Sequence, residues 1–178
     1  MHGIIFDQLR EFANARLGAR GWERLSAEAK LSNKMYLAFN AYPDPEMVQL
    51  VEATCRLTGL STQAVLEDFG QFIVPGLVKT YRVHFRPEWT LFDFVEHIER
   101  IHDKVRSDRN ATPPKLFTHR EGPQQVRVTY RSERKLCALG VGFIKGLSHA
   151  MKQPVTVREL QCMHRGADSC ELQVSASA

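Results

Sequence analysis

The first half of the chain repeats its hydrophobic positions at three- and four-residue steps, which is the periodicity of amphipathic helices. The first predicted helix ends near Gly18 and carries its apolar face at Ile5, Leu9, Phe12 and Ala13. A second helical segment is predicted around residues 22–31. These faces predict a helical core, but periodicity alone does not tell whether part of it borders a ligand.

Turn residues predict where two further helices begin. Asp44 can cap a helix, and Pro45 can occupy its first turn, where the missing proline N–H costs no hydrogen bond. Ser61 or Thr62 starts the next helix, which we expect to end before Pro75 because proline breaks a helical interior.

The most informative helix is predicted from Leu91 to Val105. It begins with a capping box, in which the side chains of Thr90 and Asp93 each satisfy a backbone N–H of the first turn. One stripe of the helix runs through Leu91, Val95, Ile98, His102 and Val105. A histidine therefore occupies a position where a leucine would be expected.

The second half has the composition of strands on either side of one helix. Strands are predicted at 115–120, 126–134, 155–163 and 170–174, and a glycine-containing helix at 135–151. A proline-containing loop at 107–114 separates this half from the central helix. The glycines would let the helix approach a sheet or a flat ligand closely, and they are Gly140, Gly142 and Gly146.

This order of elements predicts an α+β fold, with an N-terminal helical subdomain followed by a C-terminal subdomain that combines an antiparallel sheet with a packed helix. The chain of 178 residues is long enough for a sizeable core. We expect a single domain over residues 1–178, divided into a helical subdomain at about 1–62 and a second subdomain at about 63–178.

Composition narrows the class of partner. Hydrophobic residues at 43% and charged residues at 25% are ordinary globular values. The net charge of +4 comes from scattered side chains without a basic stripe, so we expect no nucleic-acid partner. No apolar run approaches the roughly 20 residues that span a bilayer, and the first residues do not resemble a signal peptide. We expect a soluble, cytoplasmic protein with no membrane partner.

Two groups of polar residues point to ligand chemistry. His102 is either a core histidine with a hydrogen-bonded ring or a neutral imidazole offered to a metal in a dry pocket. Tyr130, Ser132 and Arg134 alternate along a predicted strand and so share one face. Two hydroxyls and a guanidinium can bind a carboxylate, which belongs either to a ligand or to an acidic side chain of the protein.

Taken together, these motifs resemble the H-NOX family, the heme nitric oxide and oxygen binding domains found as bacterial sensors and at the N-terminus of soluble guanylate cyclase. The resemblance covers nearly the whole chain and rests on the segments MHGIIFDQL, YPDPE, ERIHDKV, ATPPKL, Y-x-S-x-R and KLCALGVGFIKG. It implies a stand-alone bacterial type of domain that binds one heme b between its two halves.

The resemblance also implies roles for single residues. His102 would be the proximal ligand of the heme iron, while the heme propionates would be bound by Tyr130, Ser132 and Arg134. A proline of the preceding loop presses on the heme in the family. Pro114 matches that position best, and Pro113 is the weaker candidate.

Ligand choice depends on the distal side of the heme. Family members that bind oxygen stably use a tyrosine five residues beyond the motif arginine, and this chain has Leu139 there. The rest of the distal wall is matched by Ile5, Leu9, Val65 and Phe69. None of these side chains can donate a hydrogen bond to bound oxygen. We therefore expect a ferrous heme that binds nitric oxide and carbon monoxide, with little stable oxygen binding.

The mechanism implied by the resemblance is a switch without chemistry on a substrate, so we expect that the protein is not an enzyme. Nitric oxide would weaken or break the bond between iron and His102, and the helix at 91–105 would then relax. The expected partner is a histidine kinase or a cyclic-di-nucleotide enzyme. We expect a monomer or a weak homodimer.

Three of the four cysteines form a candidate metal site. Cys162 and Cys170 flank a hairpin turn, and Cys137 lies on the helix expected to pack nearby, so three soft thiolates can bind zinc. Some bacterial family members hold zinc with three cysteines and a histidine three residues before the first hairpin cysteine. This chain has Glu159 there, and His164 could replace the histidine as a ligand. The sequence therefore leaves two alternatives for these cysteines, a structural zinc site and three free thiols.

Two other classes of function remain. A heme-free domain of the same fold could bind another small ligand, or sense redox state through zinc or thiols. A heme enzyme such as a peroxidase is disfavoured, because the predicted distal wall lacks the histidine or arginine that would manage protons.

Overall fold

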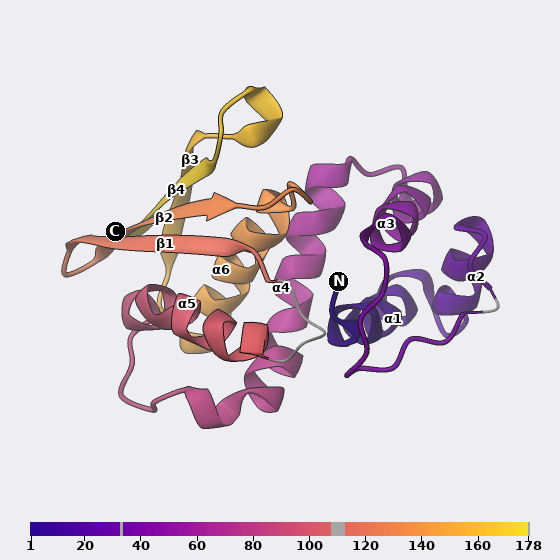
Figure 1. The fold of residues 1–178 in the computed structure, drawn as a ribbon, viewed down its shortest axis with the longest axis horizontal. Helices are drawn as coiled ribbons and strands as arrows, with labels where there is room; N and C mark the ends of the chain where they lie inside the picture. The colour runs from indigo at the N-terminus through magenta and orange to yellow at the C-terminus, as the bar shows by residue number, and fades with distance from the viewer. Residues whose placement is uncertain (33, 108–112, 178) are drawn as a thin grey trace.

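The computed structural model describes residues 1–32, 34–107 and 113–177. Its helices and strands, in chain order, are α1 (Gly3–Leu17), α2 (Gly21–Glu28), α3 (Asp44–Thr58), α4 (Thr62–Thr80), the short 3-10 helix η1 (Arg82–His84), α5 (Leu91–Ser107), β1 (Lys115–Gly122), β2 (Gln125–Arg131), α6 (Cys137–Met151), β3 (Val155–Gln161), the short 3-10 helix η2 (Met163–Arg165) and β4 (Cys170–Ala176). Most of the predicted loop at 107–114 lies outside the described residues. Helices α1 to α3 form one side of the molecule and the sheet forms the other, with α4 and α6 between them (Figure 1).

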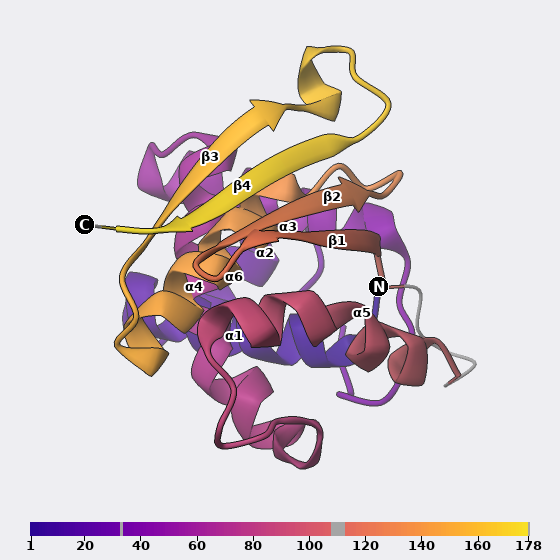
Figure 2. The ribbon, with the colours of Figure 1, turned by 90° about the vertical axis from the view of Figure 1, so that its left-hand side faces the viewer.

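The four described strands form one antiparallel sheet in the order β1-β2-β4-β3. In the register of this sheet, Tyr130 lies opposite Leu116 on one side and Cys170 on the other. Helix α5 packs along β1 and β2, and Figure 2 shows it running beneath them. The predicted α+β fold, with helices first and an antiparallel sheet after, is confirmed.

Helix ends follow the predicted capping residues in some places and not in others. Ser61 caps α4, because its hydroxyl accepts a hydrogen bond from the Ala64 N–H at 3.2 Å. Asp44 does not cap α3. It is the first residue of that helix, and its carboxylate binds the Met1 amino group at 2.7 Å instead. The prediction that Asp44 is the cap was therefore wrong, since a stronger charged partner takes the carboxylate.

Helix α4 continues through Pro75 to Thr80, so the prediction that it ends before this proline was wrong. The proline removes one backbone hydrogen bond, whereas the residues before it are held by packing. Ile73 and Val74 are both buried, and together they contact both hydrophobic cores of the protein. Tertiary packing therefore outweighs the local cost of the proline.

Two hydrophobic cores share α4. The first core lies among α1, α2, α3 and the early part of α4, and its fully buried residues include Phe6, Leu9, Leu25, Leu50 and Phe69. The second core lies between the sheet and helices α5 and α6, and its fully buried residues include Leu91, Leu147, Val126, Leu172 and Val174. Burial of such side chains supplies about 1.5–3 kcal/mol each. The subdomain boundary near residue 62 stays a prediction.

Glycines bring α4 and α6 into close contact. A β-carbon on Gly142 would lie 2.1 Å from the Glu67 carbonyl oxygen, and one on Gly70 would lie 2.3 Å from the Leu139 carbonyl oxygen. A β-carbon on Gly146 would lie 2.6 Å from a methyl group of Val74. The close approach that the sequence predicts for this helix is therefore directed at another helix. Along α6, Gly140 differs, because among the described residues no atom of another element lies within 4 Å of an added β-carbon there.

Candidate functional site

Helix α5 starts where the sequence predicts. The Asp93 N–H donates to the Thr90 hydroxyl at 3.2 Å, and the Thr90 N–H donates to the Asp93 carboxylate at 2.9 Å, which confirms the capping box. The Leu91 N–H donates to the side chain of Gln153 at 2.7 Å. With Leu91 completely buried, the first turn of α5 is fixed in the second core.

His102 presents an imidazole to a cavity from the later part of α5. Burial and the positive charge of Arg106 lower its pKa to about 4. Hydrogen bonding to the Pro114 carbonyl has the opposite, smaller effect. The ring is therefore neutral at physiological pH, which is the form that binds metals. Its Nδ1 atom is buried and has no hydrogen-bond partner in the described part of the chain, while Glu99 Oε2 lies 3.7 Å away. A buried ring nitrogen without a partner is unusual in a plain core histidine.

The cavity beside His102 has a volume of about 250 Å³ and lies between the two halves of the molecule. Side chains of α1, α4, α5, α6 and the sheet contribute to its wall. The apolar part of the lining includes Ile4, Ile73, Leu77, Phe85, Phe94, Val95, Ile98, Ile101, Leu116, Val128, Leu136, Phe143, Ile144, Leu147 and Leu172. A flat hydrophobic ligand would find a dry environment there.

Polar groups gather at one part of this wall. Strand β2 ends at Arg131, so Ser132 and Arg134 belong to the turn that follows and not to the strand predicted at 126–134. The turn needs a residue with positive φ, which is Lys135 at 51°. Burial alternates through the turn, since residues 130, 132 and 134 are buried or half-buried and their neighbours are exposed. The three motif residues therefore share one face as predicted, although the backbone after Arg131 is a turn and not a strand.

The three motif residues form a donor group. Ser132 Oγ accepts from the Arg134 backbone N–H at 3.3 Å and lies 3.5 Å from its Nε, so the serine orients the guanidinium. Tyr130 Oη accepts from the Leu136 N–H at 3.1 Å, which leaves its own proton available, and burial raises the pKa of this phenol. The Arg134 side chain is 14% exposed and lies 3.6 Å from Asp44 Oδ1. A carboxylate entering the cavity would meet a charged donor and a neutral hydroxyl.

The structure brings together six of the ten residues predicted at the cofactor. Those that line the cavity are His102, Tyr130, Arg134, Pro114, Ile5 and Leu139, and the weaker candidate Pro113 lines it as well. Ser132 is not in the lining and acts through Arg134. The other three are buried in the first core and are not among the lining residues, and they are Leu9, Val65 and Phe69.

Sequence reasoning missed two polar residues of the wall. Tyr81 caps the end of α4, and His2 caps the start of α1, where its Nδ1 accepts from the Ile4 N–H at 3.4 Å. These two side chains add a phenol and an imidazole to the cavity wall, and the apolar distal wall stays a prediction. Ile73, Leu77 and Tyr81 follow each other at four-residue steps, a signal that the predicted end of the helix before Pro75 concealed.

The three predicted cysteines form a second cluster. Cys162 Sγ lies 3.7 Å from Cys137 Sγ and 3.6 Å from Cys170 Sγ, and all three thiols are buried. They are a group whose ligand atoms could hold one metal ion. Burial raises the pKa of the Cys137 and Cys170 thiols. His164 is not part of the group, because its Nε2 contacts the Lys135 carbonyl oxygen at 2.8 Å.

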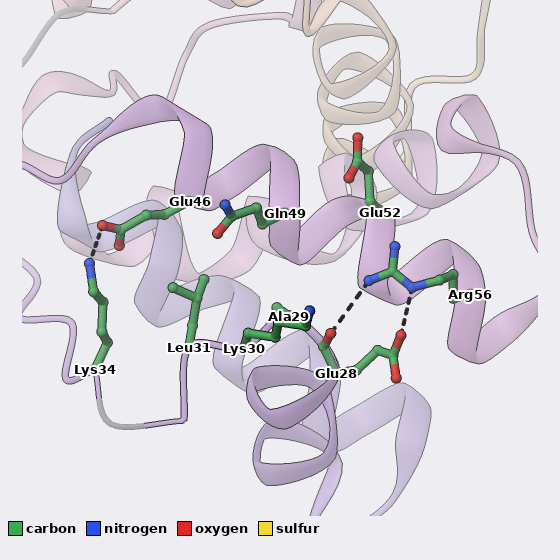
Figure 3. A pocket seen from close by; sticks show the side chains of 9 residues that line it. All are labelled: Glu28, Ala29, Lys30, Leu31, Lys34, Glu46, Gln49, Glu52 and Arg56. Carbon is green, nitrogen blue, oxygen red and sulfur yellow. Dashed lines mark hydrogen bonds and ion pairs between the residues drawn. The ribbon is translucent and has the colours of Figure 1, made fainter.

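A further hollow of about 500 Å³ lies on the surface between α2 and α3 (Figure 3). Four of its charged side chains form two ion pairs. Lys34 binds Glu46, and Arg56 Nε donates to Glu28 Oε1 at 2.6 Å. Because most of its charged side chains already pair within the hollow, it is a weaker candidate site than the cavity. No helix in the described ranges is long and apolar enough to cross a bilayer.

Comparison with known proteins gives consistent results. The family model described as "Haem-NO-binding" matches residues 2–159. An H-NOX protein from S. oneidensis, solved in the Fe(II)NO state, is 25% identical with a TM-score of 0.92, and 100% of each chain is covered. The SO2144 H-NOX domain from Shewanella oneidensis, solved in the Fe(II)CO state, is also 25% identical, with a TM-score of 0.88 over 99% of each chain.

More distant structures share the fold alone. The I5F mutant of T. Tengcongensis H-NOX is 16% identical with a TM-score of 0.85, and the comparison covers 100% of this chain and 98% of that one. No curated protein matches the sequence.

Proposed function

Because this chain belongs to the H-NOX family, we propose that it is a heme-based sensor that binds nitric oxide and carbon monoxide and has no catalytic activity of its own. The observation that carries the proposal is the apolar cavity. Its wall contains a neutral imidazole on α5 and, separately, a group of donors after β2 that suits a carboxylate. The similar proteins of S. oneidensis were solved with nitric oxide or carbon monoxide on ferrous iron.

The residues present fit a heme b group. Nδ1 of His102 is buried and finds no hydrogen-bond partner among the residues that the structure describes, which suits an imidazole whose other nitrogen faces a metal. Arg134 and Tyr130 suit two propionates. When bound, heme supplies a ferrous iron that takes nitric oxide or carbon monoxide. The chain then contributes His102 as the iron ligand, Tyr130 and Arg134 as the propionate donors, with Ser132 orienting Arg134, and an apolar wall that excludes water.

Oxygen exclusion is the finer part of the proposal. Leu139 and Ile5 line the cavity and cannot donate a hydrogen bond, so a bound oxygen would lack the stabilisation that its partial negative charge requires. Tyr81 also lines the cavity, and its hydroxyl is the group to test. We expect no stable oxygen complex when the ferrous protein is exposed to air. If one forms, the Tyr81→Phe variant decides whether this phenol supports it.

The decisive experiment is a visible spectrum of the heme-loaded protein. We expect the ferrous wild type to bind nitric oxide and carbon monoxide, and the His102→Gly variant to lose heme unless imidazole is added. His97→Gly is the matched control. It removes a histidine from the same helix whose Nδ1 contacts the Asp93 carbonyl at 2.7 Å and whose ring centroid lies 4.6 Å from that of Trp89. Unchanged heme binding in His102→Gly would refute the assignment.

Signalling would follow from release of His102. The later part of α5 is only half-buried, so this segment can move more easily than the first turn, which is fixed in the second core. We propose that a histidine kinase or a cyclic-di-nucleotide enzyme reads the resulting change. Co-purification of the heme-loaded protein with the candidate enzyme, with and without nitric oxide, tests this step.

A second proposal concerns the cysteine cluster, where three buried thiols within reach of one ion favour structural zinc. The carboxylate of Glu159 binds Arg165 at 2.6 Å, so Glu159 can supply the fourth ligand only if this ion pair breaks. His164 would have to leave the Lys135 carbonyl. Metal analysis of the purified protein separates zinc from a thiol group that senses redox state.

A further inference from the structure

Glu99 lies one helical turn before His102 on α5, and its carboxylate is held from two directions. Oε1 accepts from Arg106 Nη2 at 2.6 Å, on the same helix. Oε2 accepts from the Leu116 backbone N–H at 3.1 Å, on strand β1. The side chain is therefore fixed between helix and sheet, unlike a surface glutamate that is free to rotate.

The imidazole of His102 lacks an acceptor on the side that faces this carboxylate. Nδ1 is buried without a hydrogen bond in the described ranges, and it lies 3.7 Å from Glu99 Oε2. A neutral imidazole carries one proton, so a ring that offers Nε2 to a metal must carry the proton on Nδ1. Oε2 has a second lone pair available for it.

We propose that Glu99 is a positioning residue for His102, in which Oε2 accepts the hydrogen bond of Nδ1 and thereby keeps Nε2 unprotonated and directed at the iron. This inference rests on the heme-binding function proposed above. Closing the gap to hydrogen-bond length requires a movement of roughly 1 Å. A carboxylate partner makes the imidazole a stronger electron donor, as carboxylates hydrogen-bonded to metal-ligating histidines do at other metal sites.

The backbone carbonyl of Pro114 is the competing acceptor. It belongs to the same cavity wall as His102, and hydrogen bonding to it acts to raise the pKa of His102, but it already accepts from Arg106 Nη2 at 2.9 Å. Charged acceptors form the stronger hydrogen bonds, which favours Glu99. Arg106 binds both acceptors and withdraws charge from Glu99. Removal of Glu99 and removal of Arg106 should therefore change the imidazole in opposite directions.

The test uses the full heme-loaded chain. Glu99→Gln keeps the size of the side chain and an acceptor for the Leu116 N–H but removes the charge. We expect a lower iron–histidine stretching frequency in the resonance Raman spectrum of the ferrous protein, and about tenfold faster transfer of heme to apomyoglobin. Arg106→Gln should raise the same frequency, because Glu99 then keeps its full charge.

Glu96→Gln is the matched control, since it makes the same change on α5 at a residue that faces Arg120 at 3.5 Å and not His102. It should leave the frequency unchanged. An unchanged frequency in Glu99→Gln overturns the inference, and so does an equal shift in Glu96→Gln or a shift of the same sign in Arg106→Gln. A wild-type chain that takes up no heme overturns the proposed function and this inference with it, which distinguishes the two failures.

Discussion

The contact between α4 and α6 makes Gly142→Ala a demanding test of the packing. The new methyl group would lie 2.1 Å from the Glu67 carbonyl oxygen and 2.8 Å from the adjoining carbonyl carbon, both of which are backbone atoms of a helix. No side-chain rotation can relieve this overlap. The two helices must separate by roughly 1 Å, and the close contacts at Gly70 and Gly146 are lost at the same time.

The magnitude follows from two opposing effects. Overpacking of this severity costs about 3 kcal/mol, at the upper end of the usual range. Alanine has a better helix propensity than glycine by about 1 kcal/mol, which offsets part of the cost. We therefore expect a net loss of about 2 kcal/mol in the free energy of unfolding. Gly140→Ala is the control on the same helix. Its methyl group meets no atom of another element within 4 Å in the described part of the chain, so it should stabilise by up to about 1 kcal/mol.

Urea unfolding measures both variants, and it is best done without added heme so that residue 140, which lines the cavity, contributes only its helix propensity. With an m-value of about 2 kcal/mol/M, Gly142→Ala should lower the midpoint by about 1 M, while Gly140→Ala should raise it slightly. A midpoint for Gly142→Ala at or above that of the wild type would refute the reasoning. Equal losses in the two variants would refute it too.

Three further outcomes are expected. Asp93→Ala should lower the free energy of unfolding by about 1 kcal/mol, because the capping box with Thr90 is lost. Hydrogen bonds from Thr90 lower the pKa of Asp93. The stabilisation by Asp93 is therefore present above the ordinary pKa of a carboxyl group and is lost as the pH falls below that pKa, so wild type and variant should converge in acid unfolding. Cys170→Ser should abolish stoichiometric zinc in metal analysis without removing heme, and retained zinc would contradict the three-cysteine site. Pro114→Ala should shift the heme spectrum and the nitric oxide dissociation rate while heme stays bound; loss of heme would mean that this proline holds the cofactor instead of pressing on it.

The parts of the fold that were predictable from sequence are those fixed by neighbouring residues. The capping box at Thr90 and Asp93 and the hairpin that joins Cys162 to Cys170 each depend on contacts within about ten residues. The apolar stripe of α5 placed His102 on the inner face, since the period of a helix determines which side chains share a face. The cavity could then be inferred because a second motif near Tyr130 needed a ligand.

The errors have one physical origin, which is packing between distant segments. Helix α4 passes Pro75 because buried neighbours hold it, and the sequence around a proline does not record what packs against it. Once that helix was expected to stop, Leu77 and Tyr81 could not be seen as part of the cavity wall. Phe69 lies in the first core, and its place at the cofactor stays a prediction, because an apolar face bordering a cavity and one filling a core have the same pattern.

The uneven attachment of α5 makes this helix a lever arm. Its first turn is embedded in the second core. Its last turns are attached to the start of β1 and the residue before it, through the Glu99 contact with Leu116 and the Arg106 contact with Pro114. Each such charged hydrogen bond is worth about 1.5–3 kcal/mol, which is comparable to the burial of one apolar side chain. The start of the helix buries Leu91, Phe92, Phe94 and Val95, so the last turns open at lower cost. Seventeen residues span about 25 Å, and a tilt of about 10° around the first turn would displace the last turn by about 4 Å. His102 lies about 16 Å from the pivot, so the same tilt moves it by about 3 Å, and the last turn moves about half as far again as His102. A movement of His102 is therefore passed on, moderately enlarged, to the C-terminal end of the helix.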